Sequence, residues 1–337
     1  MKIIKPSFTE LFNDNPQKHI EGIARTCYKS TDLITEDSHK QFIKNLYDRK
    51  HWAMLEHYIF VYKLNYIEES GEYSIFLKEI EQAKYINHSI TYLNSTVNGN
   101  DERYIISFSA RSLLDLLNHY VATNFIMMKN AITELIEQVV LDYDCDELFG
   151  NRFKKVDRSA KFVKIDDITK LTPEEQWIHG WKSIKFICDR GVSHEIVRHR
   201  DASFAQESTR YCNYAKDKFG KEITVIKPCY LKDGSDNPNN EMVAWGVWKR
   251  AIENSEKSYF EMLDLGCNSQ EARAVLPNSL KTEIIMTAHN YEWGHFFELR
   301  CDKAAHPQMR ELSLPLFDYF TASNSLLFNR DNIKFTE

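Results

Sequence analysis

The chain has 337 residues, of which 43% are hydrophobic, 27% charged and 13% aromatic, a composition that is typical of a globular protein and excludes a disordered or collagen-like chain. Its 43 Lys and Arg stand against 49 Asp and Glu, a formal net charge of −6, which argues against sequence-independent binding of nucleic acid over a broad surface. The 11 glycines lie too far apart to form a GxGxxG or Walker loop, so Rossmann and P-loop nucleotide sites are excluded.

The first predicted elements alternate between strand and helix. A short strand is expected at residues 2–4, helices at 16–28 and 36–49, and a strand in the alternating run 58–64. This mixture of helices and strands is typical of the α+β class. From about residue 65 to 172, polar loops surround two further helices.

Those two helices are predicted at 111–120 and 123–142. We interpret 67–172 as a largely helical insertion within a single domain that spans 1–337, although the length alone would also fit about two domains of ~150 residues.

The second half of the chain is predicted to be mainly helical. Apolar residues recur at helical spacing over 175–190, 242–265 and 278–291, and a last helix is expected over 307–322. A strand-like segment at 222–227 interrupts them.

Seven widely spaced cysteines without a CxxC pair are typical of a reduced, cytoplasmic protein with neither a disulfide framework nor a zinc finger. No segment approaches the ~18 apolar residues of a membrane-spanning helix, and MKIIKPSFTELF contains no signal-peptide core. We therefore expect a cytoplasmic protein with no membrane contact.

Some residues of the sequence could indicate a zinc site or a cysteine nucleophile, but neither is favoured. His194 and His199 stand at i and i+5, about 140° apart around a helix, whereas a zinc helix needs i and i+4. Cys27 and Cys212 were considered as nucleophiles because Arg210 is close to the second, but neither has a base placed by the sequence. Small buried thiols are the favoured interpretation of both.

The segment 198–211, RHRDASFAQESTRY, carries three arginines, a histidine and two serines. Such a density of planar donors suits a phosphate or a planar anionic ring. The alternative, a solvated basic face or an ion-pair network with Glu195, Asp201 and Glu207, stays open on composition. The flanking apolar residues favour a half-buried anion pocket.

The same segment resembles the RHRxxSxxxxSxR signature of flavin-dependent thymidylate synthases at all six positions. Further motifs resemble the same family: ARTCY at 24–28, LEH at 55–57 followed by Phe60, RAVLP at 273–277, WGHFFELR at 293–300 and AHPQMR at 305–310. The resemblance covers about 1–66 and 173–320. It implies an α+β fold with a central antiparallel-rich sheet and flanking helices.

The resemblance also implies a reaction, the reductive methylation of dUMP to dTMP, with methylenetetrahydrofolate as carbon donor, FAD as hydride carrier and NADPH as reductant. It implies a homotetramer whose active sites are shared between subunits. Arg300 takes the catalytic position, where a guanidinium stabilises negative charge on the N3/O4 side of uracil and so makes C5 nucleophilic. Ser208 has no base beside it and is assigned to binding.

Site residues follow from the same resemblance. The substrate would be bound by Glu195, Ile196, Val197, Arg198, Gln206, Glu207, Ser208, Thr209, Arg210, Arg273 and Arg300. The flavin would be bound by His57, Ile59, Arg198, His199, Arg200, Gln206, His289, Tyr291 and His295, with His57 and Ile59 facing the flavin of another subunit. No metal ligand is expected.

At His289 and Tyr291 the sequence departs from the Asn and Arg that this family usually has. A homologue that installs a different one-carbon group, a dUMP hydroxymethylase, therefore remains an alternative. A second alternative is a non-enzymatic nucleotide- or RNA-binding protein that stacks bases on Phe204 and Tyr211.

Overall fold

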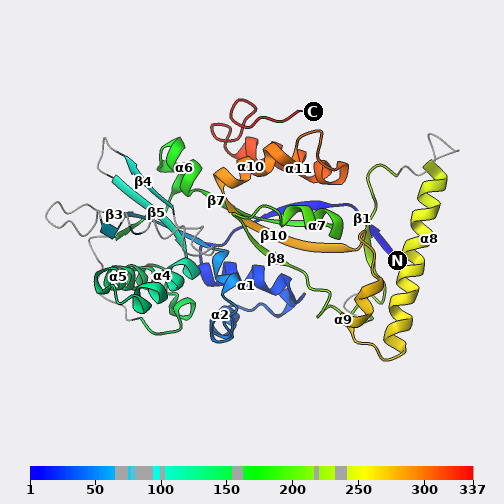
Figure 1. The fold of residues 1–337 in the computed structure, drawn as a ribbon, viewed down its shortest axis with the longest axis horizontal. Helices are drawn as coiled ribbons and strands as arrows, with labels where there is room; N and C mark the ends of the chain where they lie inside the picture. The colour runs from blue at the N-terminus through cyan, green and yellow to red at the C-terminus, as the bar shows by residue number, and fades with distance from the viewer. Residues whose placement is uncertain are drawn as a thin grey trace.

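A four-stranded antiparallel sheet lies at the centre of the molecule (Figure 1). Its strands, in order, are β2 (Ser7–Leu11), β7 (Trp181–Asp189), β10 (Lys281–His289) and β8 (Ser203–Gln206). Helices and strands are mixed, so the α+β class predicted from the sequence is confirmed. The computed structural model describes residues 1–64, 75–76, 79, 94–98, 103–153, 162–215, 220–231 and 241–336.

The two longest strands of this sheet correct the sequence prediction, which placed helices at 175–190 and 278–291. A short helix, α6 (Pro173–His179), occupies only the start of the first segment, and the chain then continues as β7. Strands β7 and β10 pair along nine residues each, and most of β10 is buried. Both faces of the sheet are covered, and buried polar residues such as Ser183 and Thr287 stand among the apolar ones. Apolar and polar residues therefore do not alternate cleanly along these strands, and periodicity did not separate them from helices.

Helices cover the two faces of the sheet (Figure 1). On one face, α7 (Arg190–Ile196), α10 (Asn290–Arg300) and α11 (Pro307–Ser323) pack on alternate residues of β7 and β10 to form an aromatic-rich core. On the other face, α1 (Pro16–Thr26) and α2 (Ser38–Asp48) form part of a second, larger core.

A second antiparallel sheet, in the order β4–β5–β3–β6, extends the molecule beyond α1. Only the first of its strands in the chain was expected from the sequence. Both helices predicted within 67–172 are present, and the structure adds three strands that were not predicted there. The missed strands are short or begin in polar sequence, which leaves little periodic signal. The elements are β3 (Ile59–Leu64), β4 (Asn94–Asn98), β5 (Arg103–Ser109), α4 (Ala110–Ala122), α5 (Ile126–Tyr143) and β6 (Phe162–Lys164).

Side chains of α4 and α5 share one hydrophobic cluster with those of α1 and α2. The packed cluster therefore runs without a break from the central sheet into the segment that carries the second sheet. Parts of 67–172 lie outside the residues that the structure describes.

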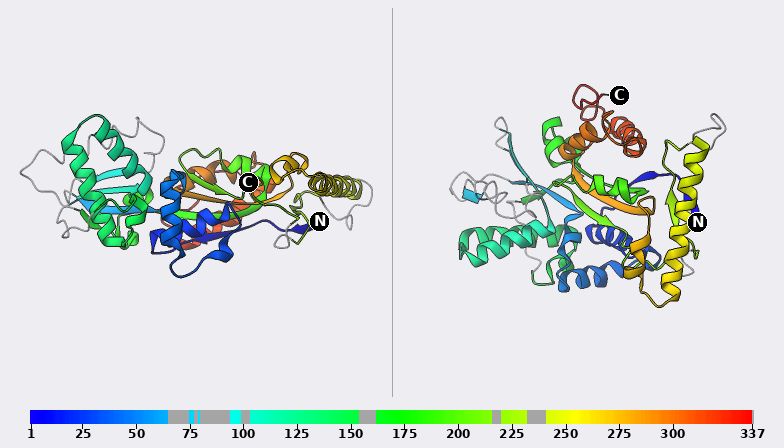
Figure 2. Two further views of the ribbon diagram at one scale, coloured as in Figure 1. Left: turned by 90° about the horizontal axis from the view of Figure 1, so that it is seen from below. Right: turned by 45° about the vertical axis from the view of Figure 1, so that its right-hand side comes forward.

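The opposite end of the molecule is formed by the long helix α8 (Glu241–Asp264), as both views show (Figures 1 and 2). It packs with α9 (Ser269–Ala272) near a parallel strand pair, β1 (Lys2–Ile4) and β9 (Thr224–Ile226). None of the helices in the described ranges has the length and apolar character needed to cross a membrane. The 3₁₀ helices are η1 (Thr31–Leu33), η2 (Trp52–Glu56), η4 (Asp146–Phe149), η5 (Ile168–Lys170) and η7 (Arg273–Val275).

Candidate functional site

The signature segment runs from the end of α7 through a turn into β8, and it is held there by local caps. The carboxylate of Asp189 accepts a hydrogen bond from the Val192 amide at 2.7 Å and thereby caps α7. After Ile196 the helix ends in a turn that carries 197–202, and β8 then pairs with β10. The turn is therefore fixed between a capped helix and a sheet edge.

Arg300, at the end of α10, lies against this turn. Its guanidinium donates hydrogen bonds to the Glu195 carbonyl at 2.9 Å, to the Glu195 carboxylate at 3.2 Å and, through Nε, to His199 Nε2 at 3.1 Å. Burial lowers the pKa of Arg300 from its ordinary value, although the carboxylate of Glu195 opposes the shift. An arginine nevertheless keeps its charge near neutral pH. Among the described residues, Arg300 pairs with Glu195 on α7 and not with its own neighbours Glu298 or Asp302.

His199 connects the turn to α10. Only 3% of this residue is exposed, and its Nδ1 lies 2.9 Å from a carboxylate oxygen of Glu292, itself 5% exposed. Because the Arg300 Nε–H can only donate, His199 Nε2 must accept, and we therefore assign its proton to Nδ1. Both ring nitrogens of His199 are thus engaged by α10, and His295 lies exposed beside it with ring centroids 5.7 Å apart.

Two of the sequence motifs meet at a buried carboxylate. Glu56, in the LEH segment, accepts a hydrogen bond from the Ser203 hydroxyl of the signature and one from Arg111 at 2.5 Å. Burial raises the pKa of Glu56, opposed by these two donors. Arg111 comes from α4, so the segment between the two motifs contributes directly to the support of β8.

The strand that follows the turn places its polar residues in two environments. Gln206 Nε2 donates to Ser193 Oγ at 2.8 Å and to Thr282 Oγ1 at 3.2 Å. Glu207 is 3% exposed and accepts from Lys281 at 2.9 Å. Glu207 is therefore part of an internal ion-pair network, as the alternative interpretation of this segment held, although its partner is outside the signature.

That network contains four charged side chains at one end of the sheet. Lys281 lies 2.8 Å from Glu283, and Lys29 contacts Glu283 and is 3.7 Å from Glu207. Burial works against ionisation of Glu283, but Lys281 and Lys29 prevail and hold its pKa at about 2. A cavity of about 520 Å³ opens beside these groups. Nothing in the sequence motifs pointed to Lys281, because it lies in a segment predicted to be helical.

The next residues of the signature are tied to the end of α1. The Ser208 amide donates to the Cys27 carbonyl at 3.1 Å, and Tyr211 packs on Tyr28 with ring centroids 5.3 Å apart. Burial raises the pKa of the Cys27 thiol to about 11, so it is a poor nucleophile near neutral pH. Cys212 is also buried.

Several arginines named from the sequence are exposed around this region. None of them forms an ion pair with another described residue, and Arg210 lies over the Tyr211 ring at 5.6 Å from its centroid. Ile196 and Thr209 are buried, whereas Val197 is 38% exposed. The exposed arginines are Arg198, Arg200, Arg210 and Arg273.

The remaining residues expected at the flavin lie inside the protein. His57 is fully buried and hydrogen bonds Thr287 Oγ1 at 2.7 Å, and burial lowers its pKa to about 3. Ile59 is 2% exposed. His289 is also buried, and its ring stacks on Tyr291 with centroids 5.6 Å apart and planes 11° apart. His57, Ile59 and His289 are thus buried, unlike the exposed arginines, and Tyr291 is half-buried.

A buried hydrogen-bonded chain that sequence reasoning missed starts at His57. Thr287 continues to Ser183 at 2.6 Å, and Ser183 to His19 at 3.2 Å. Burial lowers the pKa of His19 to about 4. These residues are far apart along the chain, and apart from His57 they match no motif. The paired strands β7 and β10 bring Ser183 and Thr287 together.

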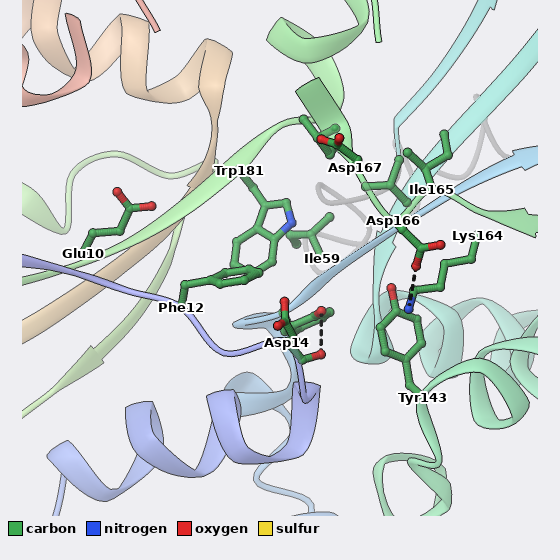
Figure 3. A pocket seen from close by; sticks show the side chains of 13 residues that line it. Glu10, Phe12, Asp14, Ile59, Tyr143, Lys164, Ile165, Asp166, Asp167 and Trp181 are labelled. Atoms are coloured by element: carbon green, nitrogen blue, oxygen red, sulfur yellow. Dashed lines mark hydrogen bonds and ion pairs between the residues drawn. The ribbon is translucent and has the colours of Figure 1, made fainter. Parts of the chain in front are cut away.

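A cavity of about 560 Å³ lies where the two sheets join (Figure 3). Among the sequence-predicted site residues only Ile59 lines it, and two of its acidic groups are already paired, Glu10 with Lys182 at 2.8 Å and Asp166 with Lys164 at 2.9 Å. The rest of the lining is mainly aromatic or aliphatic. The cavity is therefore not assigned to the chemistry of the signature.

Comparison with known proteins agrees with the position of the signature. A family model described as thymidylate synthase complementing protein matches residues 149–322, slightly more than half of the chain. The chain is similar to "flavin-dependent thymidylate synthase" of Pyrococcus furiosus, 31% identical over 131 residues that make up 39% of this chain and 50% of the relative.

Relatives of the same name in two further organisms give similar matches. The Geobacter sulfurreducens protein is 33% identical over 38% of this chain and 50% of its own length, and the Sulfurisphaera tokodaii protein is 30% identical over 52% and 68%. The chain thus spans about half the length of the first two relatives that we compare.

Proposed function

Because the chain belongs to the thymidylate synthase complementing protein family, we propose that it is a flavin-dependent thymidylate synthase that methylates dUMP to dTMP. Methylenetetrahydrofolate supplies the carbon, FAD carries the hydride and NADPH is the reductant in this proposal. The relatives named above carry the flavin-dependent name, and the geometry around Arg300 carries the argument for this chain.

The supporting observation is the number of donors that Arg300 keeps. A guanidinium has five N–H groups, and three of them bind Glu195 and His199. One N–H on each terminal nitrogen remains for a ligand. Directed at the N3/O4 side of uracil, these two donors stabilise negative charge on the ring and so raise the nucleophilicity of C5.

Substrate binding falls to the exposed arginines and the residues next to them. Arg210 and Arg273 are suited to bind the nucleotide phosphate, because a guanidinium matches phosphate oxygens with two parallel donors. Ser208 supplies a hydroxyl at the end of the same segment. Its Oγ accepts a hydrogen bond from the Arg210 amide at 3.3 Å, and in this proposal the hydroxyl binds substrate.

The donor set beside Arg300 also fits an anionic flavin cofactor. Arg198 and Arg200 are exposed on the turn, and His295 is exposed next to it on α10, so cationic and hydrogen-bonding groups share one surface. Bound there, FAD would supply hydride transfer. An open surface of this kind is completed by a neighbouring subunit in our proposal of a homotetramer with shared sites.

The test is turnover under anaerobic conditions with dUMP, FAD, NADPH and methylenetetrahydrofolate, read by mass spectrometry of the nucleotide. The proposal predicts dTMP. A hydroxymethyl product would replace the methylase with the hydroxymethylase alternative, and a protein that binds no flavin and leaves dUMP unchanged would favour the nucleotide- or RNA-binding alternative.

A further inference from the structure

The two ends of α10 are connected through a buried histidine from another part of the chain. Glu292 in the first turn and Arg300 in the last turn both bind the His199 ring, at 2.9 and 3.1 Å. We infer that Glu292 and His199 are positioning residues, which fix the direction in which Arg300 presents its two free N–H groups. This inference rests on the proposed function only for what Arg300 does to a ligand.

The hydrogen-bond directions allow only one tautomer of the His199 ring. Arg300 Nε–H can only donate, so His199 must be neutral and accept at Nε2. Its Nδ1–H is then directed at the Glu292 carboxylate, which can only accept when ionised. Removal of the carboxylate removes the preference for this tautomer, and an Nε2–H tautomer would point a hydrogen at the Arg300 Nε–H.

Burial makes the arrangement rigid. His199 and Glu292 are 3% and 5% exposed, and the Phe296 ring packs against the imidazole with centroids 5.0 Å apart. Glu195 holds the terminal nitrogens of the same guanidinium from the other side. Arg300 is thus fixed at all three nitrogens, and its free donors face only the remaining open direction.

This role differs from that of a flavin ligand, which the family resemblance gives to His199. Both ring nitrogens are already engaged, so the ring can bind a flavin through a nitrogen only if it releases Glu292 or Arg300. Arg198 and Arg200 on either side of His199 are exposed. Within Arg198-His199-Arg200, the two arginines are therefore open to a ligand, whereas the histidine contacts Arg300 inside the protein.

Four variants of the full-length protein test the inference. His199→Phe removes both hydrogen bonds, His199→Gln keeps an acceptor that can reach Arg300, and Glu292→Gln replaces the carboxylate with an amide that can donate to Nδ1. His194→Gln, on the exposed side of α7, is the matched control. For each we would measure kcat and KM for dUMP, bound flavin per chain, and the rate of flavin reduction by NADPH.

We expect His199→Phe to lower kcat by at least ~10²-fold, the scale of losing a preorganised donor, with bound flavin and its reduction by NADPH within about twofold of wild type. His199→Gln should recover about tenfold of that loss, and Glu292→Gln should lower kcat by about tenfold. His194→Gln should match wild type. Wild-type kcat in His199→Phe, or the absence of any recovery in His199→Gln, would overturn the inference, as would loss of flavin from both His199 variants.

A measurement that does not depend on the reaction separates this inference from the proposed function. In crystal structures of wild type and His199→Phe, the Arg300 guanidinium should move away from the Glu195 carbonyl in the variant. A guanidinium that stays in place would refute the positioning role even in an active enzyme. A wild-type protein without turnover would refute the proposed function, while the two structures would still decide the role of His199.

Discussion

Replacement of Arg300 by lysine tests whether the shape of this cation matters as well as its charge. The ammonium of lysine is a compact point charge, whereas the guanidinium holds Glu195 with its terminal nitrogens and His199 with Nε. Lysine cannot make all three contacts and still present two parallel N–H groups. The variant therefore keeps the charge and loses the geometry.

The expected cost follows from the number of donors lost. Loss of one preorganised donor at a developing negative charge lowers kcat by about 10²–10³-fold. At ~1.36 kcal/mol for each factor of ten, a 10²-fold loss is about 2.7 kcal/mol of transition-state stabilisation. We expect Arg300→Lys to lose at least ~10²-fold in turnover, with unchanged flavin content because Arg300 is assigned to the substrate and not to the flavin.

The assay is single-turnover oxidation of the reduced protein-bound flavin in the presence of dUMP and methylenetetrahydrofolate, together with dUMP affinity. Arg250→Lys, on the exposed surface of α8, is the control and should leave both values unchanged. Normal dUMP affinity and normal flavin oxidation in Arg300→Lys would remove Arg300 from the active site. Arg300 would then have only a structural role, through its contacts with Glu195 and His199.

Three further predictions concern thiols, pH and packing. Cys27→Ala combined with Cys212→Ala should keep turnover within about tenfold of wild type, a change in the activation barrier of under ~1.4 kcal/mol, because burial keeps the Cys27 thiol protonated. Abolished turnover in a folded, flavin-bound double variant would instead support a thiolate mechanism. In urea unfolding, the free energy of unfolding should fall as the pH drops below about 6.5, by up to ~1.4 kcal/mol per pH unit from His57 alone. Burial lowers the pKa of His57 in the folded protein to about 3, so the unfolded chain binds the extra proton. His57→Gln should reduce this dependence of stability on pH, and an unchanged dependence would contradict the assignment. Gly294→Ala should lower the free energy of unfolding by about 1–3 kcal/mol, because the new Cβ would lie 2.3 Å from a tryptophan ring of α6. Gly22 lies in an open helical position, so Gly22→Ala should raise the free energy of unfolding by about 0.5–1 kcal/mol. Equal effects of the two substitutions would refute the packing argument.

The elements that the sequence predicted well are those with one solvent-facing side. Helices α4, α8 and α11 lie within two residues of their predicted bounds at the printed ends, because an amphipathic helix shows its period in the sequence. Strands β7 and β10 have helices on both faces and show no clean alternation. The strand signal was therefore lost in β7 and β10, although it was kept in β3, which is also largely buried.

The site was predictable where its residues are adjacent in the chain. The turn from α7 to β8 carries the exposed Arg198 and Arg200 on either side of the buried His199, and Arg300 contacts the end of α7 through Glu195. Glu292 was not predicted, because its partner His199 is 93 positions away and nothing in the local run marks its side chain as inward-facing. Such a contact is decided by the packing of α10 on the sheet.

Burial of the histidines is the second feature that motifs could not supply. His57 belongs to a motif linked with the flavin, yet it is fully buried and bonded to Thr287 in β10. Its environment depends on β10 being a strand, which the sequence analysis had taken for a helix. The hydrogen-bond partner of His57 therefore could not be predicted from the motif alone.

The most direct test of the central claim is the stoichiometry of a single turnover. The purified protein is reduced with NADPH under anaerobic conditions and mixed with dUMP and methylenetetrahydrofolate, and the oxidised flavin and the nucleotide are quantified together. The account predicts one dTMP for each flavin oxidised, and no oxidation when dUMP is left out. Flavin oxidation that is independent of dUMP, or a nucleotide that gains no methyl group, would contradict it.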